Sequence, residues 1–293
     1  MIGIDWGTST FRAFRLDADG TVLDRRAAAR GILAVEDGRF EEELLRQVGD
    51  WLADGERQVL MSGMIGSRQG WQEAPYVACP VGPADIVAAL GTVVCEGADL
   101  RLVPGLTCTD AAGTPEVLRG EETQIVGVLD EMAARALVCL PGSHSKWARI
   151  EAGRIAGFET YFTGEAFAAL RAHTILGRLM RDAPTDPDAF GRGVARAAEP
   201  GHLLHHLFGV RTLGLFGRLG EASAASYLSG LLIGHEVRAA LPADGTTVHV
   251  IGNDELCALY ARALIACGVA PVVHAEDAAA RGLMRLGREA TWT

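Results

Sequence analysis

Short apolar runs alternate along the chain with segments whose apolar residues recur at helical spacing. The runs at 2–5, 57–61, 137–140 and 247–251 are short, apolar and followed by polar turns, which predicts buried strands. Helical spacing is clear around Leu44, Val48 and Trp51, and it predicts further helices at 85–90, 121–132, 166–180, 226–241, 254–267 and 277–286. Strands that alternate with helices in this way predict an α/β fold with mixed sheets.

One internal repeat divides the chain into two related halves. Residues 2–25 read as strand, polar turn, strand, hairpin and strand, and residues 137–160 repeat that order at similar lengths. We therefore expect two domains, an N-terminal lobe over 1–134 and a C-terminal lobe over 135–293. A length of 293 residues with 49% hydrophobic content agrees with two domains of ordinary size.

Charge and cysteine usage narrow the classes of partner. The formal net charge is −10, which disfavours binding to nucleic acid and to anionic membranes. None of the six cysteines forms a C-x-x-C pair, so reduced structural thiols are expected. The N-terminus has no basic region before an apolar run, and no segment reaches transmembrane length without a charge or a turn. These features predict a cytoplasmic protein.

Three polar turns directly follow apolar strands, at 5–10, 141–146 and 252–254. Gly lets a backbone approach an oxygen cluster closely, and Ser or Thr adds hydroxyl donors, so such turns suit phosphate. Neither G-x-x-x-x-G-K-[ST] nor G-x-G-x-x-G occurs, so a bound nucleotide would occupy neither a P-loop nor a Rossmann site. Taken singly, each turn could instead be an ordinary hairpin connection with no role in phosphate binding.

The motifs together resemble those of a known superfamily. Asp5-Trp6-Gly7-Thr8-Ser9-Thr10 is similar to the first phosphate motif of the actin, Hsp70 and sugar-kinase superfamily, 140–147 to its second, and Ile251-Gly252-Asn253 to its adenosine motif. The stretches 61–67, 119–124 and 141–147 more closely resemble the 2-dehydro-3-deoxygalactonokinase family. The resemblance implies a two-lobed actin-like ATPase fold, a duplicated ribonuclease H-like unit with a central cleft.

The resemblance also implies which residues bind ATP and Mg²⁺. Asp5, at the end of the first strand, would hold Mg²⁺ through water and serve catalysis; its alternative is a carboxylate that caps its own turn. Lys146 has a solvated surface lysine as its alternative. The implied nucleotide contacts are Gly7, Thr8, Ser9, Thr10 and Arg12 in the first motif, Gly142, Ser143, His144, Ser145 and Lys146 in the second, and Gly252 and Asn253 in the third.

A carboxylate is expected to act as the general base on the acceptor hydroxyl. In related sugar kinases an acidic residue follows a Gly shortly before the second phosphate motif, and here Gly120 precedes Glu121 and Glu122. Either glutamate could be the base. The alternative is a pair of first-turn glutamates that only favour the helix electrostatically, and Asp110 is the fallback.

The long Gly-rich loop at 62–83 is the expected sugar-acid site. Arg68 would bind the substrate carboxylate, since a planar guanidinium matches that group, and Ser67 lies beside it. Trp71 and Tyr76 would wall the pocket or only pin the loop. A surface arginine without a ligand is the alternative for Arg68.

The resulting prediction is an ATP- and Mg²⁺-dependent kinase of 2-dehydro-3-deoxy-D-galactonate, a small-molecule sugar acid, in galactonate breakdown. The substrate follows from the resemblance. A kinase of an aldose or another keto-sugar acid keeps the fold but changes the acceptor. A nucleotide-gated switch or sugar sensor is the alternative outside enzymes, and the sequence has no added recognition segment for it. A homodimer is left open.

Overall fold

The computed structural model describes residues 1–275 and 277–292, and the chain divides into two compact units. The first comprises Met1–Arg135, Ala148–Glu159 and Glu276–Thr293, and the second Ala136–Trp147 and Thr160–Ala275. The expected cut at residue 134 lies next to the first of these boundaries. The units differ from the expected two continuous lobes because the middle of a hairpin and the last helix group with the N-terminal part.

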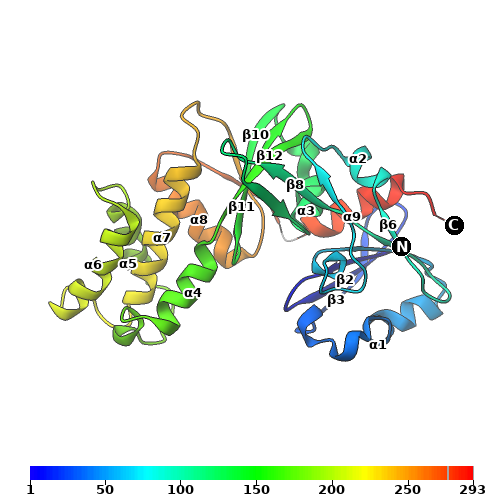
Figure 1. The fold of residues 1–293 in the computed structure, drawn as a ribbon, viewed down its shortest axis with the longest axis horizontal. Helices are drawn as coiled ribbons and strands as arrows, with labels where there is room; N and C mark the ends of the chain where they lie inside the picture. The colour runs from blue at the N-terminus through cyan, green and yellow to red at the C-terminus, as the bar shows by residue number, and fades with distance from the viewer. Residues whose placement is uncertain (276, 293) are drawn as a thin grey trace. The chain divides into compact units, whose positions relative to one another are not determined.

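A six-stranded sheet forms the centre of the first unit (Figure 1). Its order is β3-β2-β1-β4-β7-β6, in which β1, β4 and β7 are parallel to one another. The strands are β1 (Ile2–Trp6), β2 (Phe11–Leu16), β3 (Val22–Ala28), β4 (Gln58–Ser62), β6 (Gly91–Val93) and β7 (Asp99–Leu102). The carboxyl ends of β1 and β4 are therefore neighbours, which matters for the site.

A smaller sheet and several helices complete the first unit. The sheet has the order β5-β8-β9. Its strands are β5 (Tyr76–Ala78), β8 (Gly105–Thr109) and β9 (Pro115–Leu118); the helices are η1 (Ile32–Ala34), η2 (Glu36–Gly38), α1 (Phe40–Ala53), η3 (Met64–Gly66), α2 (Pro83–Ala88), α3 (Glu121–Val128), η4 (Leu129–Glu131) and α9 (Ala278–Glu289). The predicted apolar face of α1 is confirmed, because Leu44, Val48 and Trp51 are buried in the core.

Helix α9 groups with the first unit because it packs closely on α3. A Cβ on Gly127 would lie 2.0 Å from the Ala278 carbonyl oxygen, and one on Gly282 would lie 1.8 Å from the Thr123 carbonyl oxygen. Only glycine at both positions allows the two backbones to approach this far. The contact brings the end of the chain beside the helix that follows Gly120.

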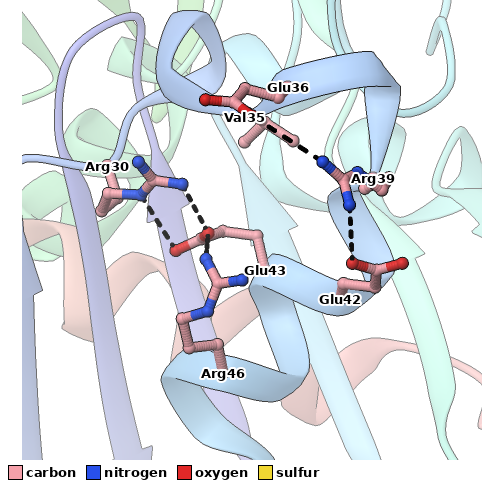
Figure 2. Close-up of a pocket in the computed structure, with 7 residues that line it drawn as sticks. All are labelled: Arg30, Val35, Glu36, Arg39, Glu42, Glu43 and Arg46. Atoms are coloured by element: carbon pink, nitrogen blue, oxygen red, sulfur yellow. Dashed lines mark hydrogen bonds and ion pairs between the residues drawn. The ribbon is translucent and has the colours of Figure 1, made fainter.

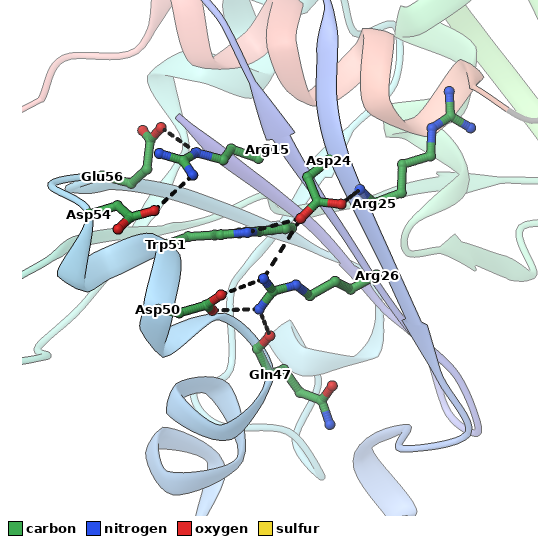
Figure 3. A network of polar contacts seen from close by, with 9 residues as sticks. All are labelled: Arg15, Asp24, Arg25, Arg26, Gln47, Asp50, Trp51, Asp54 and Glu56. Carbon is green, nitrogen blue, oxygen red and sulfur yellow. Dashed lines mark hydrogen bonds and ion pairs between the residues drawn. The ribbon is translucent and has the colours of Figure 1, made fainter.

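Ion pairs join α1 to strand β3, and the turn that follows α1 to strand β2 (Figure 3). The Arg26 guanidinium donates to both carboxylate oxygens of Asp50 at 2.5 and 2.6 Å and lies over the Trp51 ring at 4.1 Å. Its hydrogen bond lowers the pKa of Asp50 to about 2. Arg15 donates to Glu56 at 3.1 Å. These exposed pairs orient α1 rather than adding much stability.

A five-stranded sheet has the order β12-β11-β10-β13-β14, in which β10, β13 and β14 are parallel. The strands are β10 (Arg135–Leu140), β11 (Ser145–Glu151), β12 (Arg154–Tyr161), β13 (Val248–Val250) and β14 (Val272–Val273); the helices are α4 (Thr163–His173), η5 (Gly177–Leu179), α5 (Pro187–Arg196), α6 (Leu203–Leu215), α7 (Ala224–Ala240) and α8 (Asp254–Ala266). Gly230 of α7 allows close packing on α5, because a Cβ at this position would lie 2.0 Å from the Phe190 carbonyl oxygen.

Two predicted boundaries are wrong. The helix expected over 166–180 ends at His173. The polar turn expected over 141–146 ends before Ser145, where β11 begins, so Ser145 and Lys146 are strand residues rather than turn residues. Among the described residues, no helix combines the length and apolar character needed to cross a membrane.

Candidate active site

The first polar turn lies at the carboxyl end of β1. Its ends are closed by a hydrogen bond from the Gly7 amide to the Thr10 carbonyl oxygen at 2.9 Å. Two further amides, from Ile32 and Leu33, donate to the Gly7 and Thr8 carbonyl oxygens at 3.0 and 3.2 Å. The side chains of residues 8–10 are exposed. The turn is thus held from one side, and its hydroxyl groups face solvent on the other.

Asp5 precedes this turn and is nearly enclosed. Its carboxylate is 12% exposed and accepts a charge-assisted hydrogen bond from Arg12 of the neighbouring strand. Ser62 lies opposite Asp5 in the parallel register of β1 and β4, so both side chains are on the same face of the sheet. The Ser62 hydroxyl is buried and has no hydrogen-bond partner among the described residues.

Two glycines with positive φ bring α3 to this edge of the sheet. Gly63, at φ 91°, would place a Cβ 2.8 Å from the Trp6 carbonyl oxygen and 3.2 Å from Oδ1 of Asp5. Gly120, at φ 105°, would place a Cβ 3.2 Å from Cα of Gly63. Asp5, Gly63 and Gly120 therefore lie in a row, and side chains on either glycine would separate them. The sequence signal for this row was the pair of family stretches at 61–67 and 119–124.

The two candidate base residues begin α3 in different surroundings. Glu122 is fully buried; its carboxyl oxygens accept from the Gly120 amide at 2.7 Å and contact the Thr123 hydroxyl at 3.1 Å. Burial, with a smaller contribution from the neighbouring Glu121 charge, raises the pKa of Glu122 to about 8. Glu121 is only partly buried and accepts from the Arg119 amide at 3.0 Å. Of the two glutamates, Glu121 is therefore the one with solvent access.

The fallback base, Asp110, lies in the turn between β8 and β9. Its carboxylate accepts from the amides of Ala112 and Thr114, both at 2.8 Å. Backbone hydrogen bonds, that of Thr114 first, lower the pKa of Asp110. These hydrogen bonds give Asp110 a structural role, since its carboxylate stabilises the hairpin turn.

The expected sugar-acid residues have mostly local contacts. Arg68 is 86% exposed and donates to Glu73 at 3.0 Å, and the Ser67 hydroxyl accepts from the Gln69 amide at 3.3 Å. Trp71 stacks on Phe40 with ring centroids 6.5 Å apart, which pins the loop to the core. Tyr76 is partly exposed, and its ring covers a guanidinium that sequence reasoning did not select, that of Arg119.

A cavity of about 210 Å³ in the first unit is lined by three arginines and three glutamates (Figure 2). Arg30 and Arg46 both donate to Glu43, the former at 2.8 Å from Nη2. Arg39 lies within 3.7 Å of Glu36 and 3.6 Å of Glu42. The charges of this cavity are therefore paired with one another.

In the second unit the second motif and the adenosine motif meet at one sheet edge. They follow β10 and β13, which are parallel neighbours, so their turns leave the sheet side by side. A Cβ on Gly252 would lie 3.7 Å from the Pro141 carbonyl oxygen. The Asn253 side chain accepts from the amides of Glu255 and Leu256 at 3.0 and 3.2 Å, so it caps α8.

The surface part of the second motif is residues 142–144. Gly142 is partly exposed and Ser143 is exposed, and His144 stacks on Phe162 with ring centroids 5.3 Å apart. The His144 Nε2 lies 2.5 Å from a carboxylate oxygen of Glu165. The Ser143 carbonyl oxygen accepts from the Glu165 amide at 3.0 Å. The start of α4 therefore fixes this turn.

Ser145 and Lys146 are buried in strand β11, which changes what they can do. The Ser145 hydroxyl lies 2.7 Å from the Tyr260 hydroxyl, and Tyr260 in turn donates to Glu236 at 2.7 Å. Trp147 also donates to Glu236 at 2.7 Å. Lys146 is 7% exposed and donates to Thr160 at 2.9 Å, which excludes the solvated surface lysine. The buried Glu236 carboxylate and its hydrogen-bonded partners thus hold the strand end of the second motif in place inside the unit.

Beside Gly142 the second unit has an open cavity of about 240 Å³. Its walls are mainly apolar, with one cation, Arg171, and the hydroxyl residues Thr163, Thr185, Ser226, Ser229 and Tyr260. The residues lining it are Gly142, Thr163, Gly164, Phe167, Arg171, Ala183, Thr185, Phe190, Ala225, Ser226, Ser229, Leu232, Ile233, Leu256, Leu259 and Tyr260. Sequence reasoning missed this cavity; the only local signal was the small residues on one face of α7.

Comparison with known proteins identifies relatives over nearly the whole chain. The family model of 2-keto-3-deoxy-galactonokinase matches residues 5–286. The chain is 37% identical over 297 residues to the probable 2-dehydro-3-deoxygalactonokinase DgoK1 of Rhizobium meliloti, covering 99% of this chain and 96% of that protein. It is 32% identical over 281 residues to the 2-dehydro-3-deoxygalactonokinase of Escherichia coli, covering 95% and 94%.

Solved structures agree with this grouping. A Sinorhizobium meliloti protein assigned as a 2-dehydro-3-deoxygalactonokinase has a TM-score of 0.90 at 34% identity, covering 98% of each chain. A Porphyromonas gingivalis protein assigned as an N-acetylglucosamine kinase and the activator of 2-hydroxyisocaproyl-CoA dehydratase from Clostridium difficile each match at 12% identity, with TM-scores of 0.50 and 0.52. At this identity the two matches bear on the fold alone. The predicted actin-like ATPase fold is confirmed.

Proposed function

The chain belongs to the 2-keto-3-deoxy-galactonokinase family, and we propose that it transfers the γ-phosphate of ATP to 2-dehydro-3-deoxy-D-galactonate, giving the 6-phosphate in galactonate breakdown. The observation that carries the proposal is the row of Asp5, Gly63 and Gly120. It brings an acidic helix start beside the carboxylate of the first phosphate turn. A hydroxyl acceptor needs that pairing of base and phosphate site, whereas a nucleotide-gated switch does not.

The two surface turns would bind the phosphates. The exposed residues 8–10 carry hydroxyl groups on a turn whose conformation is already held by Ile32 and Leu33. Within the second unit, Gly142, Ser143 and His144 would supply phosphate donors of their own. Preorganised donors of this kind neutralise phosphate charge without reorganising during the reaction.

The cavity beside Gly142 would take the adenosine. Its mainly apolar walls suit a planar base, and its few hydroxyls can fix the orientation of base and ribose. Gly252 and Pro141 border the same sheet edge, so a nucleoside here would have its phosphates directed toward the 142–144 turn. Asn253 would act on the nucleotide indirectly, because its side chain caps α8.

The residues around Asp5 fit a Mg²⁺ ion held through water. Mg²⁺ uses one or two carboxylates and keeps several waters, and the Asp5 carboxylate with the unpartnered Ser62 hydroxyl provides an oxygen-lined position. When bound with ATP, the ion supplies neutralisation of phosphate charge. Arg12 keeps the Asp5 carboxylate oriented toward the turn.

Glu121 would be the general base. Its carboxylate would accept the proton of the acceptor hydroxyl as that oxygen attacks the γ-phosphorus and the bond to ADP breaks. Glu122 would instead position the start of α3, because it is fully buried and already holds the Gly120 amide.

ADP release measured across a panel of acceptors tests the proposed function. Purified protein with ATP and Mg²⁺ is expected to turn over 2-dehydro-3-deoxy-D-galactonate and to leave simple aldoses unreacted. Turnover of aldoses would keep the kinase and change the acceptor. Acceptor-independent ADP release with every compound would contradict the kinase assignment and favour the nucleotide-gated switch.

Filling the second-unit cavity tests the nucleotide site separately. Ser229→Phe is expected to raise KM for ATP about tenfold or more, equivalent to ~1.4 kcal/mol of binding, because the ring occupies the base position. Ala239→Phe, at an exposed position of the same helix, is the matched control and should leave this KM unchanged. Equal effects of the two variants would place the nucleotide elsewhere.

A further inference from the structure

Arg119 is a buried arginine with donors that nothing in the described chain uses. It follows β9 directly and precedes Gly120, and it is 9% exposed. Its Nη2 donates to the Ala74 carbonyl oxygen at 2.8 Å. Its Nε and Nη1 are buried and have no hydrogen-bond partner in the described chain. Buried polar groups are nearly always paired, so these two atoms call for a partner.

The Arg119 guanidinium also forms no ion pair with a carboxylate among the described residues. The Tyr76 ring covers the guanidinium at 4.5 Å, and Gly105 packs against that ring so closely that a Cβ there would lie 2.6 Å from Cε1. On the other side a Cβ on Gly66 would lie 3.0 Å from Nη1. A buried guanidinium without an anion is costly, and a ring face offsets only part of that cost.

We propose that Arg119 is the residue that binds the carboxylate of the sugar acid, and that Tyr76 covers this position until the substrate enters. The inference rests on the proposed function, because it assumes an acidic acceptor. A substrate carboxylate would supply the missing charge and accept from the unused donors. Arg68 fits the role less well, since it is exposed and already paired with Glu73.

Arg119 directly precedes Gly120, which lies in the row with Gly63 and Asp5. A substrate carboxylate held at Arg119 would leave the other end of the six-carbon chain free to extend along that row. The hydroxyl to be phosphorylated would then lie near Glu121, the proposed base.

The entry of the substrate requires the Tyr76 ring to move. Tyr76 belongs to the three-residue strand β5 and is 42% exposed, so its ring has solvent on one side. Displacing the ring would expose the guanidinium without disturbing the hydrogen bond to Ala74. Selectivity for acids over neutral sugars would follow, because a neutral ligand would uncover the charge without pairing it.

Comparing the acid with its neutral C1 amide tests the proposal. The measurements are kcat/KM for both compounds and calorimetric binding of both without ATP, on wild type, Arg119→Gln, Arg119→Lys and the control Arg68→Gln. Arg119→Gln is expected to lower kcat/KM for the acid by about 100-fold, through KM rather than kcat, and for the amide by less than about threefold. Arg68→Gln should change neither by more than about threefold.

The ratio of acid to amide distinguishes recognition from structural support. Equal losses for the two compounds in Arg119→Gln would overturn the proposal, because a damaged fold lowers both. Should this variant fail to fold, Arg119→Lys decides: a tenfold lower ratio is expected from a point charge that lacks the guanidinium fork, and an unchanged ratio overturns the proposal. If the wild-type protein binds the acid through Arg119 but does not phosphorylate it, the proposed function is contradicted and the role of Arg119 in binding stands.

Discussion

Glu121→Gln is expected to lower kcat for phosphorylation of the sugar acid by roughly 10²–10⁴-fold, the range for loss of a general base. The amide keeps the shape of the side chain and an oxygen that can accept from the Arg119 backbone amide, now 3.0 Å from the carboxylate. It cannot take the proton of the acceptor hydroxyl. KM for ATP should stay within about threefold, because the binding of both substrates is unaffected.

A first-turn glutamate elsewhere provides the matched control. Glu42, in the first turn of α1, is exposed, and Glu42→Gln should leave kcat unchanged. A Glu121→Gln enzyme with kcat near that of wild type would show that the carboxylate only favours the helix start electrostatically. In that outcome the base would have to be sought among other groups near Asp5.

Glu122→Gln is expected to stabilise the protein progressively as pH rises from about 5 to about 8. The folded-state pKa of Glu122 is raised to about 8, above its ordinary value of 4.5, by burial and by Glu121. Between these values the folded state keeps a proton that the unfolded state has lost, so stability falls as pH rises, by up to about 1.4 kcal/mol per pH unit. Below pH 4.5 and above about pH 8, Glu122 no longer makes the free energy of unfolding depend on pH.

Gln reproduces the neutral acid without this titration. It can accept from the Gly120 amide with its oxygen and donate to the Thr123 hydroxyl, matching the protonated carboxyl. Urea unfolding of wild type, Glu122→Gln and Glu42→Gln at pH 5, 6, 7 and 8 measures the difference. A difference in free energy of unfolding between wild type and Glu122→Gln that does not change with pH would contradict the prediction. It would show that the Gly120 amide and the start of α3 keep the Glu122 carboxylate ionised.

The strands, the turns and their order could be predicted because they depend on neighbours in sequence. The apolar runs that became β1, β4, β10 and β13 are bounded by polar turns, and the spacing of Leu44, Val48 and Trp51 marked the buried face of α1. The family motifs that led to the kinase prediction are likewise contiguous stretches of residues. The family matched over residues 5–286 confirms that reading.

Individual roles inside the motifs depended on packing. Ser145 and Lys146 read as turn residues because small and polar residues precede them, but the strand begins at Ser145. Both side chains point into the unit, where Tyr260 and Thr160 are their partners. Tyr260 lies 115 residues further along the chain than Ser145, so local pattern alone contains no sign of this contact.

The sequence by itself therefore determined the α/β fold class, the polar turns that follow β1 and β10, and the membership of a sugar-acid kinase family. Only the tertiary structure decided that Gly63 and Gly120 bring α3 to Asp5, that Glu122 is buried while Glu121 is accessible, and that Arg119 is enclosed with unused donors. The reason is physical: turns and periodicity follow from local backbone and solvent preferences, whereas burial, pKa and unpaired donors depend on atoms brought together from distant parts of the chain.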